Sequence, residues 1–145
     1  MNKARIAIVA ASFSEFITKR LLKACLIQLQ RQGVANGRIT TVWVPGSFEI
    51  PLTALRLAQR KDIDAVICLG AVIRGETYHF EVVANECARG IMQASLLSAK
   101  PVIMGVLTTD TVAQAQARSG GEGHRNKGRD AACAALDMMA LLHKI

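Results

Sequence analysis

Aromatic residues are scarce in this chain: phenylalanine, tyrosine and tryptophan together make up 4% of its 145 residues. Hydrophobic residues of all kinds still account for 51% and charged residues for 20%, which is typical of a globular protein and argues against disorder. The core must therefore consist mainly of Ala, Val, Ile and Leu, as in parallel sheets that helices cover on both faces. The length suits a single domain, and we expect one over residues 1–145.

The sequence also lacks the spacings of metal and redox sites. Its four cysteines lie too far apart for a CxxC pair and stand in apolar surroundings, which favours buried structural thiols. They are Cys25, Cys68, Cys87 and Cys133. The three histidines, His79, His124 and His143, are not spaced as ligands of one metal. We therefore expect no metal site.

No apolar stretch reaches the length of about 18 residues that a membrane-spanning helix needs. The first apolar run ends at Ser12, so the N-terminus does not resemble a signal peptide. We expect a cytoplasmic protein with no membrane partner.

The excess of positive charge, +7, is spread from Lys3 to Lys144 and forms no long basic run. A solvated surface is the simplest interpretation. The second is an electrostatic field that draws in anionic substrates such as phosphates. Nucleic-acid binding ranks third, because it would need clustered basic residues, usually with aromatic stacking groups. Neither is visible, so we expect no nucleic-acid partner.

Short apolar runs alternate with segments whose apolar residues recur at helical spacing. The runs predict strands at residues 5–10, 38–44, 65–70 and 102–107. The spaced segments predict helices at residues 16–32, 47–59, 78–98, 112–119 and 128–143. Gly33 would end the first helix, and a Gly-rich link at 120–123 would separate the last two. This order implies a parallel sheet with right-handed crossovers, so we expect an α/β fold, a flavodoxin-like three-layer sandwich with a four-stranded parallel sheet.

Open parallel sheets bind ligands beyond the carboxyl ends of their strands. The most informative of these ends is residues 70–80, GAVIRGETYHF, which we expect to form a catalytic loop. Residues 71–73 would offer backbone groups to the edge of a flat heterocycle. Residues 75–77 directly precede a helix, where free backbone N–H groups bind phosphate. His79, in the first turn of that helix, could move a proton near neutral pH, although a capping or core histidine is the alternative.

Several motifs of nucleotide and ester chemistry are absent. Segment 70–80 lacks the Gly-Lys-Ser/Thr of a P-loop, and GEGHRN at 121–126 lacks the third glycine of a dinucleotide-binding fingerprint. GSFEI at 46–50 is not a nucleophile elbow. Basic residues do gather around Glu122, namely Arg118, Arg125, Lys127 and Arg129. They form either a solvated link or a phosphate clamp, in which an arginine could grip two oxygens.

Four motifs closely resemble those of the lumazine synthase family. They are PGSFEIP at 45–51, LGAVIRGETYHF at 69–80, GVLTTD at 105–110 and NKG at 126–128. They keep the family's order and spacing over nearly the whole chain. The resemblance implies the penultimate step of riboflavin synthesis, in which 5-amino-6-(D-ribitylamino)uracil and 3,4-dihydroxy-2-butanone 4-phosphate give 6,7-dimethyl-8-ribityllumazine, phosphate and water. It also implies that no metal and no organic cofactor takes part.

The resemblance assigns the first substrate to residues of three strand ends. The pyrimidine ring would stack on Phe13. The ribityl chain would be held by Ser47, Phe48 and Glu49. The edge of the pyrimidine would be read by Ala71, Val72 and Ile73.

The resemblance assigns the phosphorylated substrate to the loop before the His79 helix. Glu76 and Thr77, mainly through their backbone amides, would hold the phosphate together with Arg118. His79 would shuttle a proton during imine formation and phosphate loss. Lys127 would lie near the site. Most of the remaining acceleration would come from holding the two substrates together.

The chain departs from the family's pattern at three of the positions around the site. Ser12 and Ser14 replace the usual Arg and Asn on either side of the stacking aromatic, and Met104 stands where the family often has Phe. An active enzyme is the first hypothesis. The second is a non-catalytic homologue that binds lumazine or flavin. A generic flavodoxin-like module comes last, because it predicts none of the four motifs.

The resemblance also implies an assembly, because the family forms pentamers with the site between adjacent subunits. Some members stack twelve pentamers into a shell, and in these an N-terminal extension precedes the first strand. This chain begins only a few residues before that strand, and its link from 118 to 127 looks one residue longer than in shell formers. We therefore expect a free pentamer, with Met104 and Arg118 contributed by the next subunit, and riboflavin synthase as a candidate partner.

Overall fold

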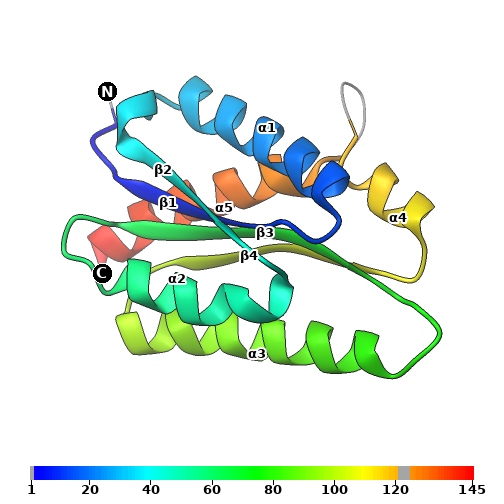
Figure 1. Ribbon diagram of the computed structural model, residues 1–145. Coiled ribbons are helices and arrows are strands. Elements are labelled where there is room, and N and C mark those ends of the chain that lie inside the picture. Colours follow the sequence, from blue (N-terminus) through cyan, green and yellow to red (C-terminus); the bar gives the residue numbers. More distant parts are fainter. Residues whose placement is uncertain (1, 121–124) are drawn as a thin grey trace.

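The computed structural model describes residues 2–120 and 125–145 (Figure 1). Most of the Gly-rich link expected at 120–123, with Glu122 and His124, lies outside the described residues. In chain order, the strands, helices and 3-10 turns are β1 (Ile6–Ala11), α1 (Glu15–Arg31), η1 (Asn36–Arg38), β2 (Ile39–Val44), η2 (Ser47–Glu49), α2 (Ile50–Ala58), β3 (Ala65–Ile73), α3 (His79–Ser98), β4 (Val102–Thr109), α4 (Val112–Ala117) and α5 (Lys127–Lys144).

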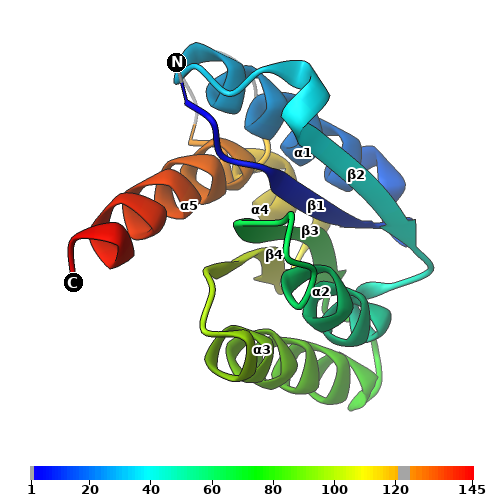
Figure 2. The same ribbon diagram turned by 90° about the vertical axis from the view of Figure 1, so that its left-hand side faces the viewer.

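The four strands form one parallel sheet in the order β2-β1-β3-β4. Helices α1 and α5 cover one face and helices α2 and α3 cover the other, so that three layers are seen in Figures 1 and 2. The predicted α/β, flavodoxin-like sandwich with a four-stranded parallel sheet is therefore confirmed. In this topology the carboxyl ends of all four strands meet at one edge, at the right of Figure 1.

The central strand β3 explains why so few aromatic residues are needed. Alternate residues point to opposite faces. On one face Ile67 and Leu69 pack under α1 and α5, and on the other Val66 and Cys68 pack over α2 and α3. Because helices cover both faces, the whole strand is apolar rather than alternating. Small aliphatic side chains fill both thin layers.

Strands β3 and β4 run further than the sequence predicts. The apolar run of β3 was expected to end at Gly70, but the strand continues to Ile73, because β4 remains paired with it as far as Ile73 opposite Thr109. The expectation of a catalytic loop over residues 70–80 is therefore wrong in its bounds. Residues 71–73 are strand and residues 74–78 are loop. His79 lies in the first turn of α3, as predicted, although the helix begins one residue later than expected.

The helix expected at 47–59 is two elements, because the 3-10 turn η2 precedes α2 and Pro51 occupies the first turn of α2. The other helices begin and end within two residues of the predicted positions. Helix α1 ends as predicted at Gly33, whose φ of 89° is the left-handed conformation that glycine adopts readily. Within residues 2–120 and 125–145, no helix is both long and apolar enough to cross a membrane.

Candidate functional site

A cavity of about 620 Å³ opens where β1, β2 and β3 end and α3 begins. It brings together nine of the residues that the sequence singles out. They are Phe13, Ser47, Phe48, Glu49, Ala71, Val72, Ile73, Thr77 and His79. Glu76 lies in the same loop between Gly75 and Thr77, but it is not among the residues that line the cavity.

The first wall of the cavity comes from the segments after β1 and β2. The backbone N–H of Phe13 donates to the carbonyl of Pro45 at 2.9 Å, which holds the two segments together. The Phe13 and Phe48 side chains are 75% and 54% exposed. Exposed aromatic rings are costly in water, and here they offer flat apolar surfaces to a ligand. Ser47 is buried beside them, whereas Glu49 is exposed.

The end of β3 forms the second wall. Its register with β1 stops at Leu69, whereas its register with β4 continues to Ile73. Backbone N–H and C=O groups of a parallel strand point alternately to its two neighbours. On the side toward β1, therefore, the last backbone groups of β3 have no strand partner within the described residues. Hydrogen-bonding groups of this kind can read the edge of a flat polar ring.

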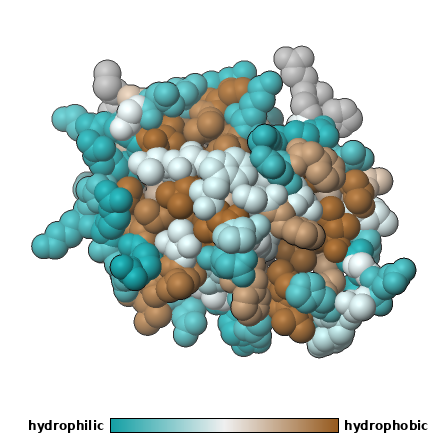
Figure 3. All heavy atoms as spheres, in the orientation of Figure 1, coloured by the Kyte–Doolittle hydropathy of each residue, from teal (hydrophilic) through white to brown (hydrophobic). Residues whose placement is uncertain are grey.

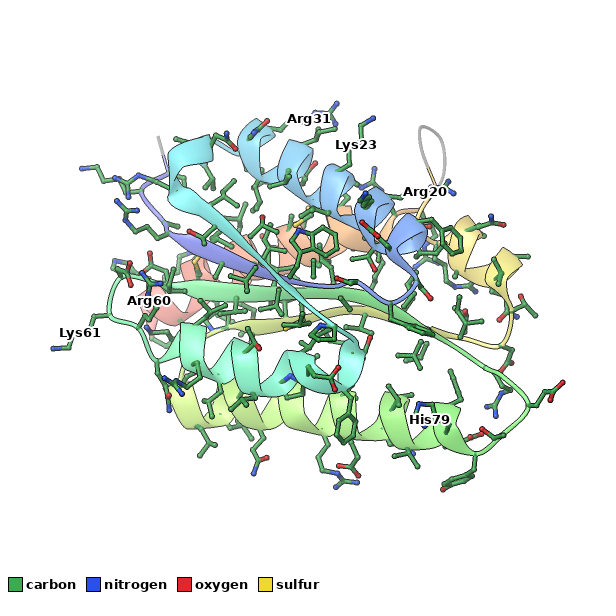
Figure 4. The ribbon with its side chains drawn as sticks, in the orientation of Figure 1. Arg20, Lys23, Arg31, Arg60, Lys61 and His79 are labelled. Carbon is green, nitrogen blue, oxygen red and sulfur yellow. The ribbon has the colours of Figure 1, made fainter. Side chains whose placement is uncertain are left out.

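The third wall is the start of α3, where His79 lies (Figure 4). The hydroxyl of Thr77 accepts a hydrogen bond from the His79 backbone N–H at 3.3 Å. Residues 75–79 are all exposed. A helix start has backbone N–H groups without carbonyl partners, which favour an anion such as phosphate. An exposed imidazole beside them can exchange protons with a bound ligand.

Arg74 lies directly behind this loop, between the end of β3 and the start of α3. Its guanidinium Nε donates to Asp110 Oδ1 at 2.8 Å, and Nη1 donates to Glu81 Oε1. Its Cζ lies 4.4 Å from the centre of the Phe80 ring. The Arg74 hydrogen bond holds the pKa of the Glu81 carboxyl below its usual range. The Glu81 carboxylate is therefore ionised at neutral pH, and the one guanidinium of Arg74 bonds to both carboxylates.

The remaining three predicted residues, Met104, Arg118 and Lys127, lie elsewhere. They line a separate hollow of about 760 Å³ along β4, which is the edge strand of the sheet. The backbone N–H of Lys127 donates to the carbonyl of Arg118 at 2.9 Å, which brings the two basic residues together. Arg125 and Asp130 also line this hollow. The strands β3 and β4 stand between the hollow and the cavity that contains His79.

The motif NKG has a local structural reason. The side chain of Asn126 accepts hydrogen bonds from the backbone N–H groups of Gly128 and Arg129, and so caps α5. Gly128 is buried where α5 crosses α1, and a side chain there would overlap the backbone of Leu21. Both flanking residues of the motif are thus structural, and Lys127 between them is exposed.

Sequence reasoning missed three apolar residues of α3 that line the cavity, Phe80, Val82 and Val83. Helical spacing could have found Val83, because it lies three and four residues beyond Phe80 and His79 and therefore on the same side of α3. It also missed Arg74, for which the sequence carries no signal because its partners lie 7 and 36 residues away.

The described residues contain no cluster of candidate metal ligands, and most of their cysteines are buried. No group of three or more His, Cys, Asp or Glu side chains within residues 2–120 and 125–145 could hold a metal ion. Cys25, Cys68 and Cys87 are buried, as predicted, and Cys133 is half-buried. Burial raises the pKa of Cys25 to about 12 and that of Cys87 to about 11, so these thiols stay neutral and are poor nucleophiles.

Comparison with known proteins agrees with the geometry. A family profile described as 6,7-dimethyl-8-ribityllumazine synthase matches residues 3–143. The chain is 52% identical over 141 residues to proteins of that name from two strains of Thermus thermophilus, and the alignment covers 97% of this chain and 89% of each relative. It is 48% identical over 145 residues to the Protochlamydia amoebophila protein of that name, with coverage of 100% and 84%.

Proposed function

The chain belongs to the 6,7-dimethyl-8-ribityllumazine synthase family, and from that premise we propose that it is a transferase of riboflavin biosynthesis. It would join 5-amino-6-(D-ribitylamino)uracil to 3,4-dihydroxy-2-butanone 4-phosphate, giving 6,7-dimethyl-8-ribityllumazine, phosphate and water, with residues 1–145 acting as one domain and without a cofactor. The observation that carries the proposal is the single cavity in which aromatic surfaces, free strand-edge groups, a phosphate-binding turn and His79 meet.

The proposed place of the first substrate follows the walls of the cavity. Its flat ring lies against the exposed face of Phe13, with its polar edge toward the backbone of residues 71–73. The ribityl chain extends along residues 47–49, where the Glu49 carboxylate accepts hydrogen bonds from hydroxyl groups. This assignment uses the apolar surface for the ring and the polar groups for the sugar alcohol.

The proposed place of the second substrate is the start of α3. Backbone amides of Glu76 and Thr77 hold the phosphate, and Arg118 adds charge from outside the cavity. His79 then lies beside the reacting carbon chain, where it takes and returns the proton during imine formation and phosphate loss. Holding both substrates in one cavity supplies much of the remaining acceleration.

We also propose that the working form is a free pentamer. The support is that Arg118, Met104 and Lys127 line a hollow on the edge strand, so that in a single chain they do not share a cavity with His79. A neighbouring copy that presents its β4 edge to the cavity would complete the site.

The surface of α3 gives the assembly a second support. Large apolar side chains are exposed on this helix, among them Met92, Leu96 and Leu97. Figure 3 shows hydrophobic side chains at the surface along the lower edge of the molecule, where α3 lies. Apolar surface of this kind is typical of a face that another protein chain covers.

Light scattering tests the assembly. It should report about five subunits, and a particle of roughly sixty subunits would contradict the free pentamer. A cytoplasmic location and riboflavin synthase as a partner remain predictions, which fractionation and co-purification would check.

The activity is tested by mixing the two substrates with the purified protein and following lumazine absorbance and phosphate release. Turnover well above the uncatalysed reaction is expected. Its absence would remove the enzyme hypothesis and favour the non-catalytic homologue that binds lumazine or flavin.

The role of His79 is tested by the variant His79→Ala. Its kcat should fall by roughly 100-fold or more while KM changes little, because the imidazole acts in the transition state rather than in binding. His143→Ala is the matched control, since His143 is an exposed histidine near the end of α5, outside the cavity. An unchanged kcat in His79→Ala would show that positioning alone sustains the reaction.

A further inference from the structure

Residues 75–78, which carry the proposed phosphate-binding amides, have few connections of their own. They are exposed, and the side-chain hydrogen bond between Thr77 and the His79 backbone stays within the loop and the start of α3. Within the described residues, no hydrogen bond joins residues 75–78 to β4 or α4. Something else must therefore fix the distance between this loop and the ends of the strands.

Arg74 contacts the end of β4, the residue that follows β4, and the first turn of α3. Its backbone N–H donates to the carbonyl of Thr109 at the end of β4, at 2.9 Å. Its guanidinium bonds to Asp110 just beyond β4 and to Glu81 in the first turn of α3. It also covers the ring of Phe80, which lines the cavity beside His79. One planar cation thus links the two segments on either side of the loop.

The Asp110 partner is itself held in place. The Asp110 backbone N–H donates to the side chain of Gln114 at 2.8 Å. Gln114 also belongs to the capping box of α4, in which its backbone N–H donates to the Thr111 hydroxyl at 3.1 Å. The backbone that carries the Asp110 carboxylate is therefore anchored to a capped helix start.

We propose that Arg74 is a positioning residue, which holds the loop of residues 75–78 and the first turn of α3 against the end of β4. It thereby keeps the Glu76 and Thr77 amides and His79 at a fixed place in the cavity. This inference rests on the proposed function for its catalytic consequence, but the tether itself does not. Exposed ion pairs contribute little to stability, whereas small displacements of catalytic groups cost much activity. The two effects are therefore separable.

The test compares Arg74→Ala with Arg60→Ala. Arg60 also forms an exposed pair, with Asp62, through two bonds of 2.9 and 2.7 Å, and lies at the opposite end of the sheet from His79 (Figure 4). Arg74→Ala should raise KM for the butanone phosphate and lower kcat, each about tenfold, and leave KM for the uracil within about twofold. Its melting temperature should match that of Arg60→Ala, whose kinetics should be those of the wild type.

Two further variants separate geometry from charge. Arg74→Lys keeps the charge but cannot form the planar two-armed contact, so it should recover only part of the activity. Adding Glu81→Gln and Asp110→Asn to Arg74→Ala removes the carboxylates that the lost cation would leave uncompensated. If that triple variant regains wild-type KM, Arg74 acts through charge alone and the positioning role is overturned. A continued defect supports it.

Hydrogen exchange measures the tether without any turnover. Exchange in the peptide of residues 74–83 should be faster in Arg74→Ala than in the wild type and unchanged in Arg60→Ala. Unchanged exchange in Arg74→Ala would overturn the proposal even if the wild type is active. Faster exchange in Arg74→Ala, in a protein whose wild type shows no turnover, would uphold the tether and reject the proposed function. Equal losses for both substrates with a lowered melting temperature would identify a merely structural residue.

Discussion

Ser14 has the least favourable backbone conformation in the neighbourhood of the cavity. Its φ of 58° and ψ of 43° lie in the left-handed region, and it precedes α1 without a capping hydrogen bond from its side chain. Only glycine, asparagine and aspartate adopt this region at low cost. The family's usual asparagine at this position therefore has a backbone reason, which serine does not satisfy as well.

Ser14→Asn should accordingly stabilise the protein by about 0.5 kcal/mol, because asparagine tolerates the left-handed conformation better than serine. Urea unfolding measures the difference. Ser12→Asn is the matched control: it makes the same change two residues earlier, where φ is not positive, and should leave stability unchanged. Equal shifts in both variants would show that the conformation of Ser14 is not the cause.

The buried thiol of Cys25 makes stability depend on pH in the alkaline range. Burial, with a smaller effect of Cys133, raises its pKa from 9.0 to about 12. Above pH 9 the unfolded chain loses this proton and the folded chain keeps it. Stability contributed by the neutral thiol is therefore full below pH 9 and declines as pH rises toward 12, by about 1.4 kcal/mol per pH unit.

Urea unfolding under reducing conditions at pH 8, 9 and 10 checks this expectation. Cys25→Ala should be less stable than the wild type at pH 8, because it leaves a small cavity, but its stability should decline less steeply above pH 9. Parallel declines in the two proteins would show that Cys25 does not contribute.

At the scale of elements, the crossing of α1 and α5 depends on Gly128. A Cβ on this residue would lie 2.7 Å from the carbonyl carbon of Leu21, which is backbone and cannot turn aside. Gly128→Ala should therefore push the helices apart and destabilise the protein by about 1–3 kcal/mol. Gly37→Ala is the control, since an added Cβ there meets nothing within 4 Å. Urea unfolding midpoints of Gly128→Ala and Gly37→Ala measure the difference. Similar midpoints for the two variants would contradict the close contact at Gly128.

The sequence predicts the order of the elements well, because each strand is a short apolar run and each long helix has a clear apolar spacing. Gly33 and the start of α3 at His79 are local signals of the same kind. The extension of β3 to Ile73 was missed because Gly70 resembles the end of a strand, although Ala71, Val72 and Ile73 are apolar and pair with β4. The 3-10 turn at residues 47–49 was also missed, because helical and turn propensities are alike there.

The residues of the candidate site likewise divide into those that local sequence predicts and those that depend on contacts between distant segments. Residues after one strand, such as His79 and Glu49, can be placed in the cavity from the sequence, because strand ends of a parallel sheet converge. Arg74 cannot, since its role depends on contacts with α3 and with the residue after β4. Nor does the sequence by itself, without the resemblance, separate Arg118 and Lys127 from the cavity, because their place beside β4 depends on how α4 and α5 pack.

At the scale of the whole molecule, the two hollows predict how subunits complement one another. If each site takes its cavity from one subunit and Arg118 from the next, His79→Ala and Arg118→Ala chains should each have much reduced activity separately and should regain part of it when mixed. In randomly mixed rings of equal parts, about a quarter of the sites combine an intact cavity with an intact Arg118. Activity of co-refolded mixtures measures this fraction.

The control for this experiment is a mixture prepared without refolding, in which subunits do not exchange. Recovery in the refolded mixture alone supports a shared site. No recovery, with intact oligomers in both samples, would indicate that each chain supplies its own Arg118.

Because β3 and β4 separate the cavity from the hollow, the activity of the protein should depend on its dilution. A lone subunit cannot bring its own two halves of the site together, since the paired strands β3 and β4 lie between them. In the proposed arrangement, activity per chain would then depend on protein concentration: it would be constant while rings persist and would fall once they dissociate. Free subunits released in this way would still bind the ribitylaminouracil but would not convert it to product.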